Sequence, residues 1–227
     1  MNTRGLLDQL LRSGQQLLDK KAGPANASGA AGGLGGLLSG AGGGLLGGGA
    51  LGLLLGSKKA RKYGGKALTY GGLAALGVLA YKAYGNWQAN QQVAAAEPQT
   101  LDRLPPAQAE QHSQAVLRAL VAAAKSDGHI DERERALIEG EFTRLDSDRE
   151  LQHWLHAELN KPLDPAEVAR AAQTPEMAAE MYLASVMMVD QDNFMERAYL
   201  DELARQLRLD PGLRQELESQ VRLAAGQ

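Results

Sequence analysis

Glycine at every fourth position between residues 32 and 56 is the feature that most constrains how this chain can fold. In water such a run should not hold a helix, because each interior glycine costs about 0.5–1 kcal/mol relative to alanine. In a bilayer the backbone must satisfy its own hydrogen bonds, and small residues four apart let two helices approach closely. We therefore predict a membrane packing face, a glycine zipper, through which the chain self-associates; a low-complexity linker is the alternative. The members of this glycine ladder are Gly32, Gly36, Gly40, Gly44, Gly48, Gly52 and Gly56.

Two apolar stretches on either side of a basic loop are candidates for membrane segments. Residues 34–56 cover roughly 34 Å as a helix, enough for a hydrocarbon core of about 30 Å. Residues 67–84 have tyrosine or tryptophan close to both ends, as in an aromatic belt; a buried core helix is the alternative there. The loop at 57–66, SKKARKYGGK, is expected in the cytoplasm by the positive-inside rule. If both stretches span, or only the second, the C-terminal domain faces outward; a single span at 34–56 leaves it in the cytoplasm.

The segments that border this Gly-rich apolar region, residues 23–87, are more polar. Residues 1–22 have leucines near helical spacing with charges between them, which predicts an amphipathic helix. That helix could lie on the protein surface or at a membrane interface, and the sequence leaves both interpretations open. Residues 88–104 form a polar, proline-containing stretch, and we predict a linker.

Residues 105–225 predict an all-α domain. Aromatic residues make up only 4% of the chain, which favours helices over sheet. Apolar residues recur at helical spacing, and helix-start signals separate the periodic segments, so we expect a bundle of about seven helices. These start signals are Pro105-Pro106, Asp131 with Glu134, Ser147 with Glu150, Asp164-Pro165, Thr174-Pro175 and Asp210-Pro211.

Two segments of this domain are alike. Residues 122–145 and 185–207 each contain an apolar helix ending in aspartate, a short polar turn, and a new helix with Glu-Arg-Ala. The first copy, AKSDGHIDERERALI, is similar to the signature of the TerB-like helical domain, named for tellurite-resistance proteins. A Gly-rich N-terminal region followed by that domain resembles the YebE-type inner-membrane proteins of unknown function. The resemblance implies a TerB-like bundle at the C-terminus and a location in the bacterial inner membrane.

The resemblance also implies a divalent-metal site at the acidic residues of the two turns. Carboxylates on a turn suit a hard cation such as calcium or magnesium, which binds oxygen ligands. The turns lack the glycine and the final glutamate of an EF-hand, and helix capping explains Asp131 and Glu134 equally well, so both interpretations stay open. The candidate ligands are Asp127, Asp131 and Glu134 in the first copy and Asp190, Asp192 and Glu196 in the second.

Histidine and methionine offer weaker candidates. His153 and His156 are three apart on one expected helix, but no third ligand is near in the sequence, so we interpret them as surface residues. His112 and His129 are isolated and expected in solvent. The methionines are expected to fill the core: Met177, Met181, Met187, Met188 and Met195.

The composition argues against several classes of function. The chain has no cysteine, which removes thiolate catalysis, disulfides and cysteine–zinc sites. Its formal charge of −3 suggests no nucleic-acid partner, and no nucleophile–base pair or phosphate loop is evident. We therefore expect a membrane-anchored, non-enzymatic protein whose TerB-like domain serves protein interaction or metal or stress sensing, with an unidentified protein partner. The alternative is a soluble or peripheral stress-response protein that binds divalent metal.

Overall fold

The computed structural model describes residues 3–5, 7, 72–91, 97–126, 128, 139–140, 148–189 and 192–225. The glycine ladder, the candidate membrane segment at 34–56 and the basic loop lie outside these residues. Every regular element among the described residues is a helix, which confirms the predicted all-α class.

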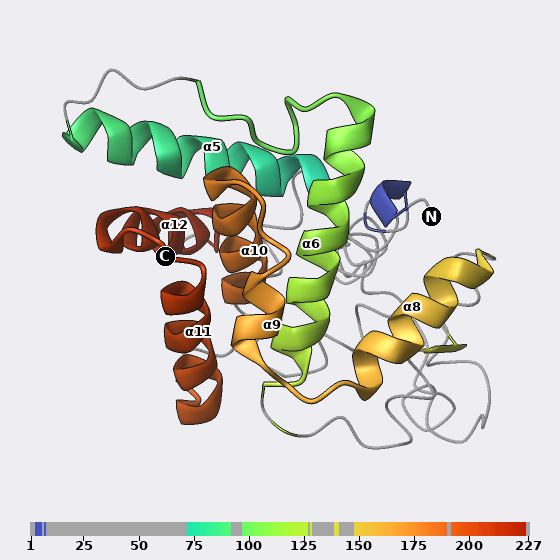
Figure 1. Ribbon diagram of the computed structural model, residues 1–227. Helices are drawn as coiled ribbons and strands as arrows, with labels where there is room; N and C mark the ends of the chain where they lie inside the picture. Colours follow the sequence, from blue (N-terminus) through green and yellow to red (C-terminus); the bar gives the residue numbers. More distant parts are fainter. Residues whose placement is uncertain are drawn as a thin grey trace, which may run out of the picture.

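Helix α10 is the centre of the described domain (Figure 1). It packs against α5, α6, α11 and α12, and all of its residues from Met177 to Met188 are buried. Helices α8 and α9 pack on α6, and α9 also contacts α11. The helices are α5 (Gly72–Gln91), α6 (Pro106–Ala124), α8 (Arg149–Asn160), α9 (Pro165–Ala169), α10 (Pro175–Met188), α11 (Phe194–Gln206) and α12 (Pro211–Ala225).

Helix starts follow the predicted capping chemistry where a polar residue precedes proline. Asp164 accepts a hydrogen bond from Ala166 N, and Thr174 accepts one from Met177 N. Asp210 Oδ1 accepts from the backbone N of the second and third residues after it, at 2.8 and 3.3 Å. Each cap satisfies an amide that the first helical turn leaves without a partner. These three starts are confirmed.

The predicted start of α8 is wrong by one residue. Ser147 was the expected cap, but Asp148 occupies that position and accepts from Glu150 N and Leu151 N. Two adjacent residues here are both good caps, and a carboxylate also interacts favourably with the positive end of the helix dipole. The local pattern therefore identified the helix but not which of the two residues begins it.

The predicted methionine core is confirmed except at one position. Met177, Met181, Met187 and Met188 are all buried in α10. Met195, at the start of α11, is 57% exposed. It lies in the first turn of its helix and away from the face that carries the buried residues of α11.

The transmembrane prediction for residues 67–84 is not supported, because the described part of this stretch belongs to a helix of the domain. Leu76, Ala80, Ala83 and Tyr84 of α5 are buried, and α5 packs against α12 and α10. Among the residues that the structure describes, no helix is long and apolar enough to cross a membrane. Helices α10 and α12 therefore cover the apolar surface that the sequence assigned to lipid, as in the core-helix alternative.

The aromatic residues at the end of α5 also serve the domain. Trp87 Nε1 donates to Asp210 Oδ1 at 2.9 Å, so the same carboxylate that caps α12 also fixes α5. Asn86 Nδ2 donates to Glu216 Oε2 of α12 at 3.2 Å. Trp87 packs edge-on against Tyr84 with ring centroids 5.8 Å apart. These rings are anchors between helices, which replaces the aromatic-belt interpretation.

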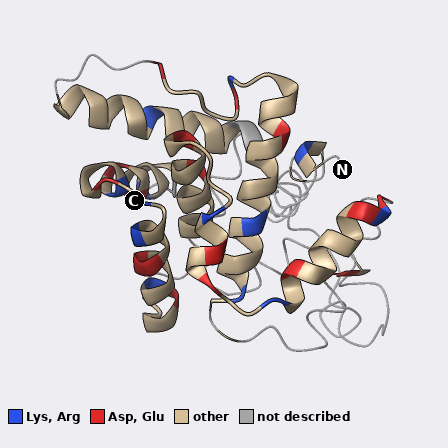
Figure 2. Cartoon of the chain, viewed as in Figure 1, with Lys and Arg blue, Asp and Glu red and all other residues tan. Residues whose placement is uncertain are grey.

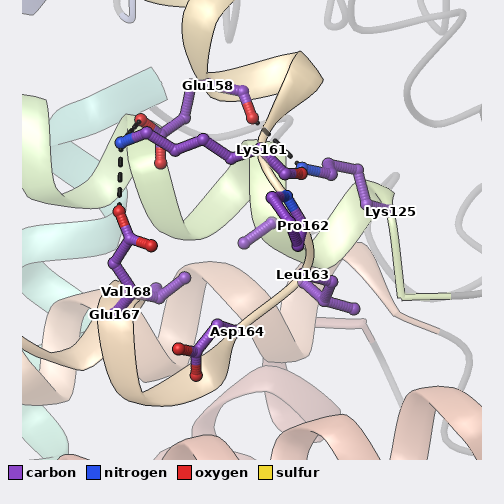
Figure 3. Close-up of a pocket in the computed structure, with 9 residues that line it drawn as sticks. Lys125, Glu158, Lys161, Pro162, Leu163, Asp164, Glu167 and Val168 are labelled. Atoms are coloured by element: carbon purple, nitrogen blue, oxygen red, sulfur yellow. Dashed lines mark hydrogen bonds and ion pairs between the residues drawn. The ribbon is translucent and has the colours of Figure 1, made fainter.

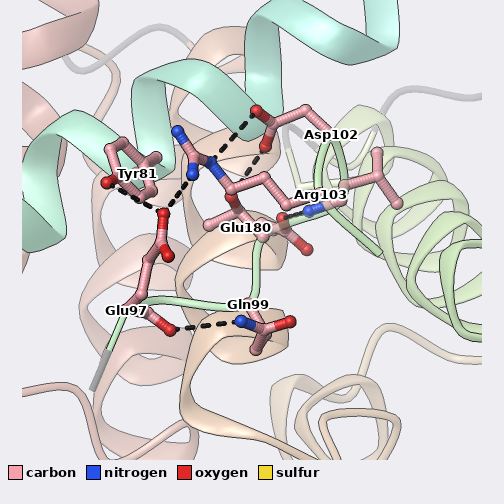
Figure 4. Close-up of polar contacts among 8 residues, drawn as sticks. Tyr81, Glu97, Gln99, Asp102, Arg103 and Glu180 are labelled. Atoms are coloured by element: carbon pink, nitrogen blue, oxygen red, sulfur yellow. Dashed lines mark hydrogen bonds and ion pairs between the residues drawn. The ribbon is translucent and has the colours of Figure 1, made fainter. Parts of the chain in front are cut away.

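The linker predicted at residues 88–104 is largely structured. Its first residues complete α5, and in its last part Thr100 and Leu101 are buried. This part passes so close to α5 that a Cβ on Gly77 would lie 2.6 Å from Asp102 Oδ1 and 2.8 Å from Asp102 N. Arg103 forms an ion pair with Glu97 and stacks over the Tyr81 ring, as Figure 4 shows. We refer to residues 97–104 as the clasp segment.

The N-terminus of the chain also docks on this domain. Thr3 N and Arg4 N donate to the two carboxylate oxygens of Glu110 on α6, at 2.5 and 3.0 Å. Thr3 and Leu7 are fully buried, and Leu7 belongs to the same hydrophobic core as Leu76 of α5. Only residues 3–5 and 7 of the amphipathic helix predicted at 1–22 are described, and they are held by the domain.

Candidate functional site

Two of the six predicted metal-site residues lie among the described residues. Asp192 is exposed in the turn before α11, and Glu196 is 9% exposed in the first turn of that helix. Asp127, Asp131, Glu134 and Asp190 lie outside the described residues, as does Gly56 with the rest of the glycine ladder. Within the part of the chain that is described, no three His, Cys, Asp or Glu side chains gather closely enough to hold a metal ion.

The residue that caps the start of α11 is neither Asp190 nor Asp192, the two aspartates predicted as metal ligands in this turn. Asn193 is the cap, and its side-chain oxygen accepts from Met195 N at 2.9 Å. An asparagine oxygen caps a helix about as well as a carboxylate does. The turn therefore reaches its conformation without using the Asp192 side chain as the cap.

The turns of the two similar segments lie next to each other. Gly128, which follows the end of α6, has a φ of 78°, a backbone conformation that glycine adopts at little cost. A Cβ at this glycine would be 3.9 Å from the terminal methyl carbon of Met195. The turn after α6 and the start of α11 are thus brought side by side, although 67 positions separate Gly128 from Met195 in the sequence.

Large apolar side chains are exposed at this junction. Phe194 is 83% exposed and Met195 is 57% exposed, while the core of α11 is formed by Tyr199, Leu200 and other residues further along the helix. Phe194 is not needed to fill the core. Exposed aromatic and methionine side chains are enriched where proteins bind one another. We refer to Gly128, Phe194 and Met195 as the turn surface.

A shallow pocket between α6, α8 and α9 is held together by lysine contacts (Figure 3). Lys125 Nζ donates to the backbone oxygens of Glu158 and Lys161, near the C-terminal end of α8, where a cation also complements the helix dipole. Lys161 Nζ pairs with Glu158 at 3.0 Å and with Glu167 at 3.1 Å. Hydrogen bonds to these two carboxylates raise the pKa of Lys161. The lysines thus fasten the α8–α9 connection to α6.

Among the described residues, the acidic or basic side chain with the lowest exposure is Glu180 of α10, which faces His112 of α6. His112 Nδ1 lies 2.5 Å from Glu180 Oε2, and Leu101 N of the clasp segment donates to Glu180 Oε1 at 2.5 Å. Glu180 is 0% exposed and His112 is 4% exposed. Burial raises the pKa of Glu180, and the hydrogen bond with His112 opposes that rise. One carboxylate therefore joins three parts of the fold.

The prediction that His112 lies in solvent is wrong. The histidine appeared isolated because its partner is 68 positions away in the sequence. The sequence around Glu180 does indicate a buried partner, because Glu180 is the only charged residue in the apolar stretch from Met177 to Met188. A carboxylate in such a helix needs a partner to be buried. The interpretation of His153 and His156 as exposed surface residues is confirmed.

Charges on the outer helices carry both signs. Figure 2 shows acidic and basic residues interspersed along α8, α11 and α12, whereas α5 and α10 carry few of them. Several of the surface charges pair within one helix, as Glu202 does with Arg205. The two signs are therefore mixed along these helices in this view, and the apolar turn surface stands out from them.

These features define a helical protein whose described core is closed by α5, the clasp segment and the N-terminus. A family described as a protein of unknown function (DUF533) matches residues 40–221. The chain therefore belongs to the DUF533 family. That family is TerB-like, which confirms the predicted resemblance at this coarser level. The finer resemblance, to the YebE-type inner-membrane proteins, stays a prediction.

One curated relative is similar to more than half of the chain. It is described as an uncharacterized protein in the ampR 5' region of Yersinia enterocolitica, and it is 36% identical over 126 residues. Those residues are 56% of this chain and 89% of the relative. No solved structure matches the chain.

Proposed function

We propose that this chain is a non-enzymatic, membrane-associated protein of a bacterial inner membrane, whose TerB-like domain binds another protein. The exposure of Phe194 and Met195 on the turn surface carries this proposal. An exposed apolar pair of this kind can bury its surface against a partner and so remove that surface from water. The neighbouring acidic residue Asp192 would supply polar contacts at the rim of such an interface.

The environment of the buried titratable pair supports a non-enzymatic role. His112 and Glu180 resemble a general acid–base pair in residue type, but they are 4% and 0% exposed. Their partners are each other and the backbone of Leu101, so they act in packing α6, α10 and the clasp segment together. A group that transfers protons must come within hydrogen-bond reach of a substrate.

Membrane association rests on the apolar glycine ladder and the basic loop that follows it. Helix α5 begins at residue 72, and the basic loop ends at residue 66. The five residues between them can extend by about 18 Å at most. If the basic loop lies on the lipid headgroups, the helical domain must lie close to the membrane surface. Lysines and an arginine in the loop would be attracted to anionic lipid headgroups.

The protein-binding proposal is tested by photo-crosslinking in living bacteria. A photoreactive amino acid is placed at position 194 of the full chain, and the control is position 223, where a 62% exposed leucine lies on α12. We expect one discrete adduct from position 194 that is lost when Met195→Ser is added, and none from position 223. The same adducts from both positions, or none from either, would contradict the proposal.

Divalent-metal binding is the alternative function, and the position of Gly128 beside Met195 favours it. This contact brings together the two turns in which the predicted acidic ligands occur. Calcium or magnesium is titrated into the full chain and the melting temperature is followed. A ligand present at about 100 times its dissociation constant stabilises a protein by about 2.7 kcal/mol. An unchanged melting temperature at millimolar metal, or an equal rise in an Asp192→Asn, Glu196→Gln variant, would count against a site at these turns.

A further inference from the structure

The N-terminus and α5 are anchored on the same domain, although the entire glycine-rich region separates them. Thr3 and Arg4 bind Glu110 through their backbone amides, and Leu7 is 0% exposed. On the other side of residues 8–71, Leu76 of α5 lies in the same core as Leu7. The residues on either side of the stretch 8–71 are therefore both anchored on the domain.

We propose that this N-terminal contact is a latch that keeps both ends of the glycine-rich region on one side of the membrane. The region then meets a lipid surface from that side, without a net crossing of the bilayer. This inference rests on the proposed membrane association and specifies its geometry. The latch consists of Thr3, Arg4 and Leu7 on one side and Glu110 of α6 on the other.

The chemistry of Glu110 explains why the latch closes. Its two carboxylate oxygens accept from consecutive backbone amides, Thr3 N and Arg4 N, at the start of a helical segment. The first amides of a helix have no partner within that helix, and its N-terminal end attracts negative charge. Leu7 adds an apolar anchor that is fully buried in the core. Side chain and backbone thus hold the segment at two points.

Each of the two simple membrane topologies conflicts with a contact in the structure. A single span at residues 34–56 would place the N-terminus across a hydrocarbon core of about 30 Å from the domain. The amide of Thr3, however, lies 2.5 Å from Glu110 of α6. A hairpin with a second span at residues 67–84 would restore both ends to one side, but α5 begins at Gly72 and packs on α10 and α12. One-sided contact with lipid satisfies both observations.

The latch is tested first by chemical protection. The chain has no cysteine, so a single Thr3→Cys substitution introduces one thiol, at a position that is fully buried. We expect this thiol to react slowly with a maleimide in the membrane-bound full chain, and roughly tenfold faster when Glu110→Lys opens the latch. Glu202→Lys, the same charge change at a half-buried site of α11 away from the latch, is the control and should leave the rate unchanged. Equal rates in all three proteins would refute the latch.

Sidedness is tested separately with a membrane-impermeant maleimide in sealed spheroplasts and inverted vesicles. Thiols introduced one at a time into the otherwise unchanged chain, by Asn2→Cys and by Ala198→Cys at an exposed site of α11, report the N-terminus and the domain. Both are expected to react from the same face of the membrane. Reaction from opposite faces would overturn the one-sided geometry while leaving membrane association intact. Absence of the chain from the washed membrane fraction would instead overturn the proposed membrane association.

Discussion

Removing the histidine of the buried His112–Glu180 pair tests whether this pair stabilises the junction of α6, α10 and the clasp segment. His112→Leu introduces an apolar side chain of similar size and leaves Glu180, which is 0% exposed, without its partner at 2.5 Å. Breaking a buried pair by removing one member costs about 3–5 kcal/mol. We expect about 3 kcal/mol, the lower end, because Leu101 N still donates to the carboxylate and Glu180 can take up a proton.

The assay is urea unfolding of the full chain in mild detergent, followed by the helical circular dichroism signal. With a denaturant dependence of about 2 kcal/mol per M, the expected loss lowers the midpoint by about 1.5 M. Adding Glu180→Met to His112→Leu removes the unpaired carboxylate and leaves only the amide of Leu101 without an acceptor. The double variant should therefore recover about 1–2 kcal/mol relative to the single variant.

The pH dependence of the same variant has a defined sign. Burial raises the pKa of Glu180 in the folded protein, and loss of His112 removes the hydrogen bond that opposes the rise. A group with a raised folded-state pKa contributes stability below its unfolded pKa and loses that contribution as pH increases through the folded value. The loss in free energy of unfolding caused by His112→Leu should therefore become smaller as the pH falls from neutral to about 5. A loss under about 1 kcal/mol, or a deficit that does not change with pH, would refute the reasoning.

Two further predictions concern α5 and α11. Gly77→Ala should destabilise the protein by about 1–3 kcal/mol in urea unfolding, because its Cβ would lie 2.6 Å from Asp102 Oδ1. Gly85→Ala in the same helix meets nothing within 4 Å and should stabilise by about 0.5–1 kcal/mol, so equal effects would contradict the close approach at Gly77. On α11, hydrogen bonds from Arg205 lower the pKa of Glu202 to about 2. Arg205→Ala should raise that pKa toward 4.5, measured by NMR titration of the carboxyl carbon, and an unchanged value would show that the pair does not form in solution.

Helix starts could be predicted because the interactions that make them are local. The caps of α9, α10 and α12 each use a polar side chain and a proline that are adjacent in the sequence. The pairing of His112 with Glu180 could not be predicted in the same way, because nothing near His112 in the sequence indicates a partner on another helix. The exposure of Met195 follows from where α11 begins, one residue after Asn193, which a sequence pattern locates only within a few residues.

The prediction of a membrane span at residues 67–84 failed for a different physical reason. Hydropathy measures how strongly a segment avoids water, and it does not distinguish lipid from protein as the replacement for water. Tyr84 and Trp87 have an apolar body and a polar tip, so they suit a membrane interface and equally suit a helix junction. Here Trp87 directs its indole N–H to Asp210, and Tyr84 is 5% exposed. Only the positions of α10 and α12 reveal which environment covers them.

The place of α5 in the helical domain also limits how the glycine ladder can meet a membrane. If α5 were a membrane segment, the number of membrane crossings would decide on which side of the membrane the domain lies. Once Leu7 and Leu76 share one core, the number of crossings between them must be even, whatever conformation residues 8–71 adopt. Two membrane spans need about 40 apolar residues, and the ladder at residues 32–56 has 25. The ladder is therefore too short to cross the membrane twice, and zero crossings is the remaining even number. Its four-residue glycine spacing would then serve packing within or between copies at one face of the bilayer, and the Glu110 latch is what requires that arrangement.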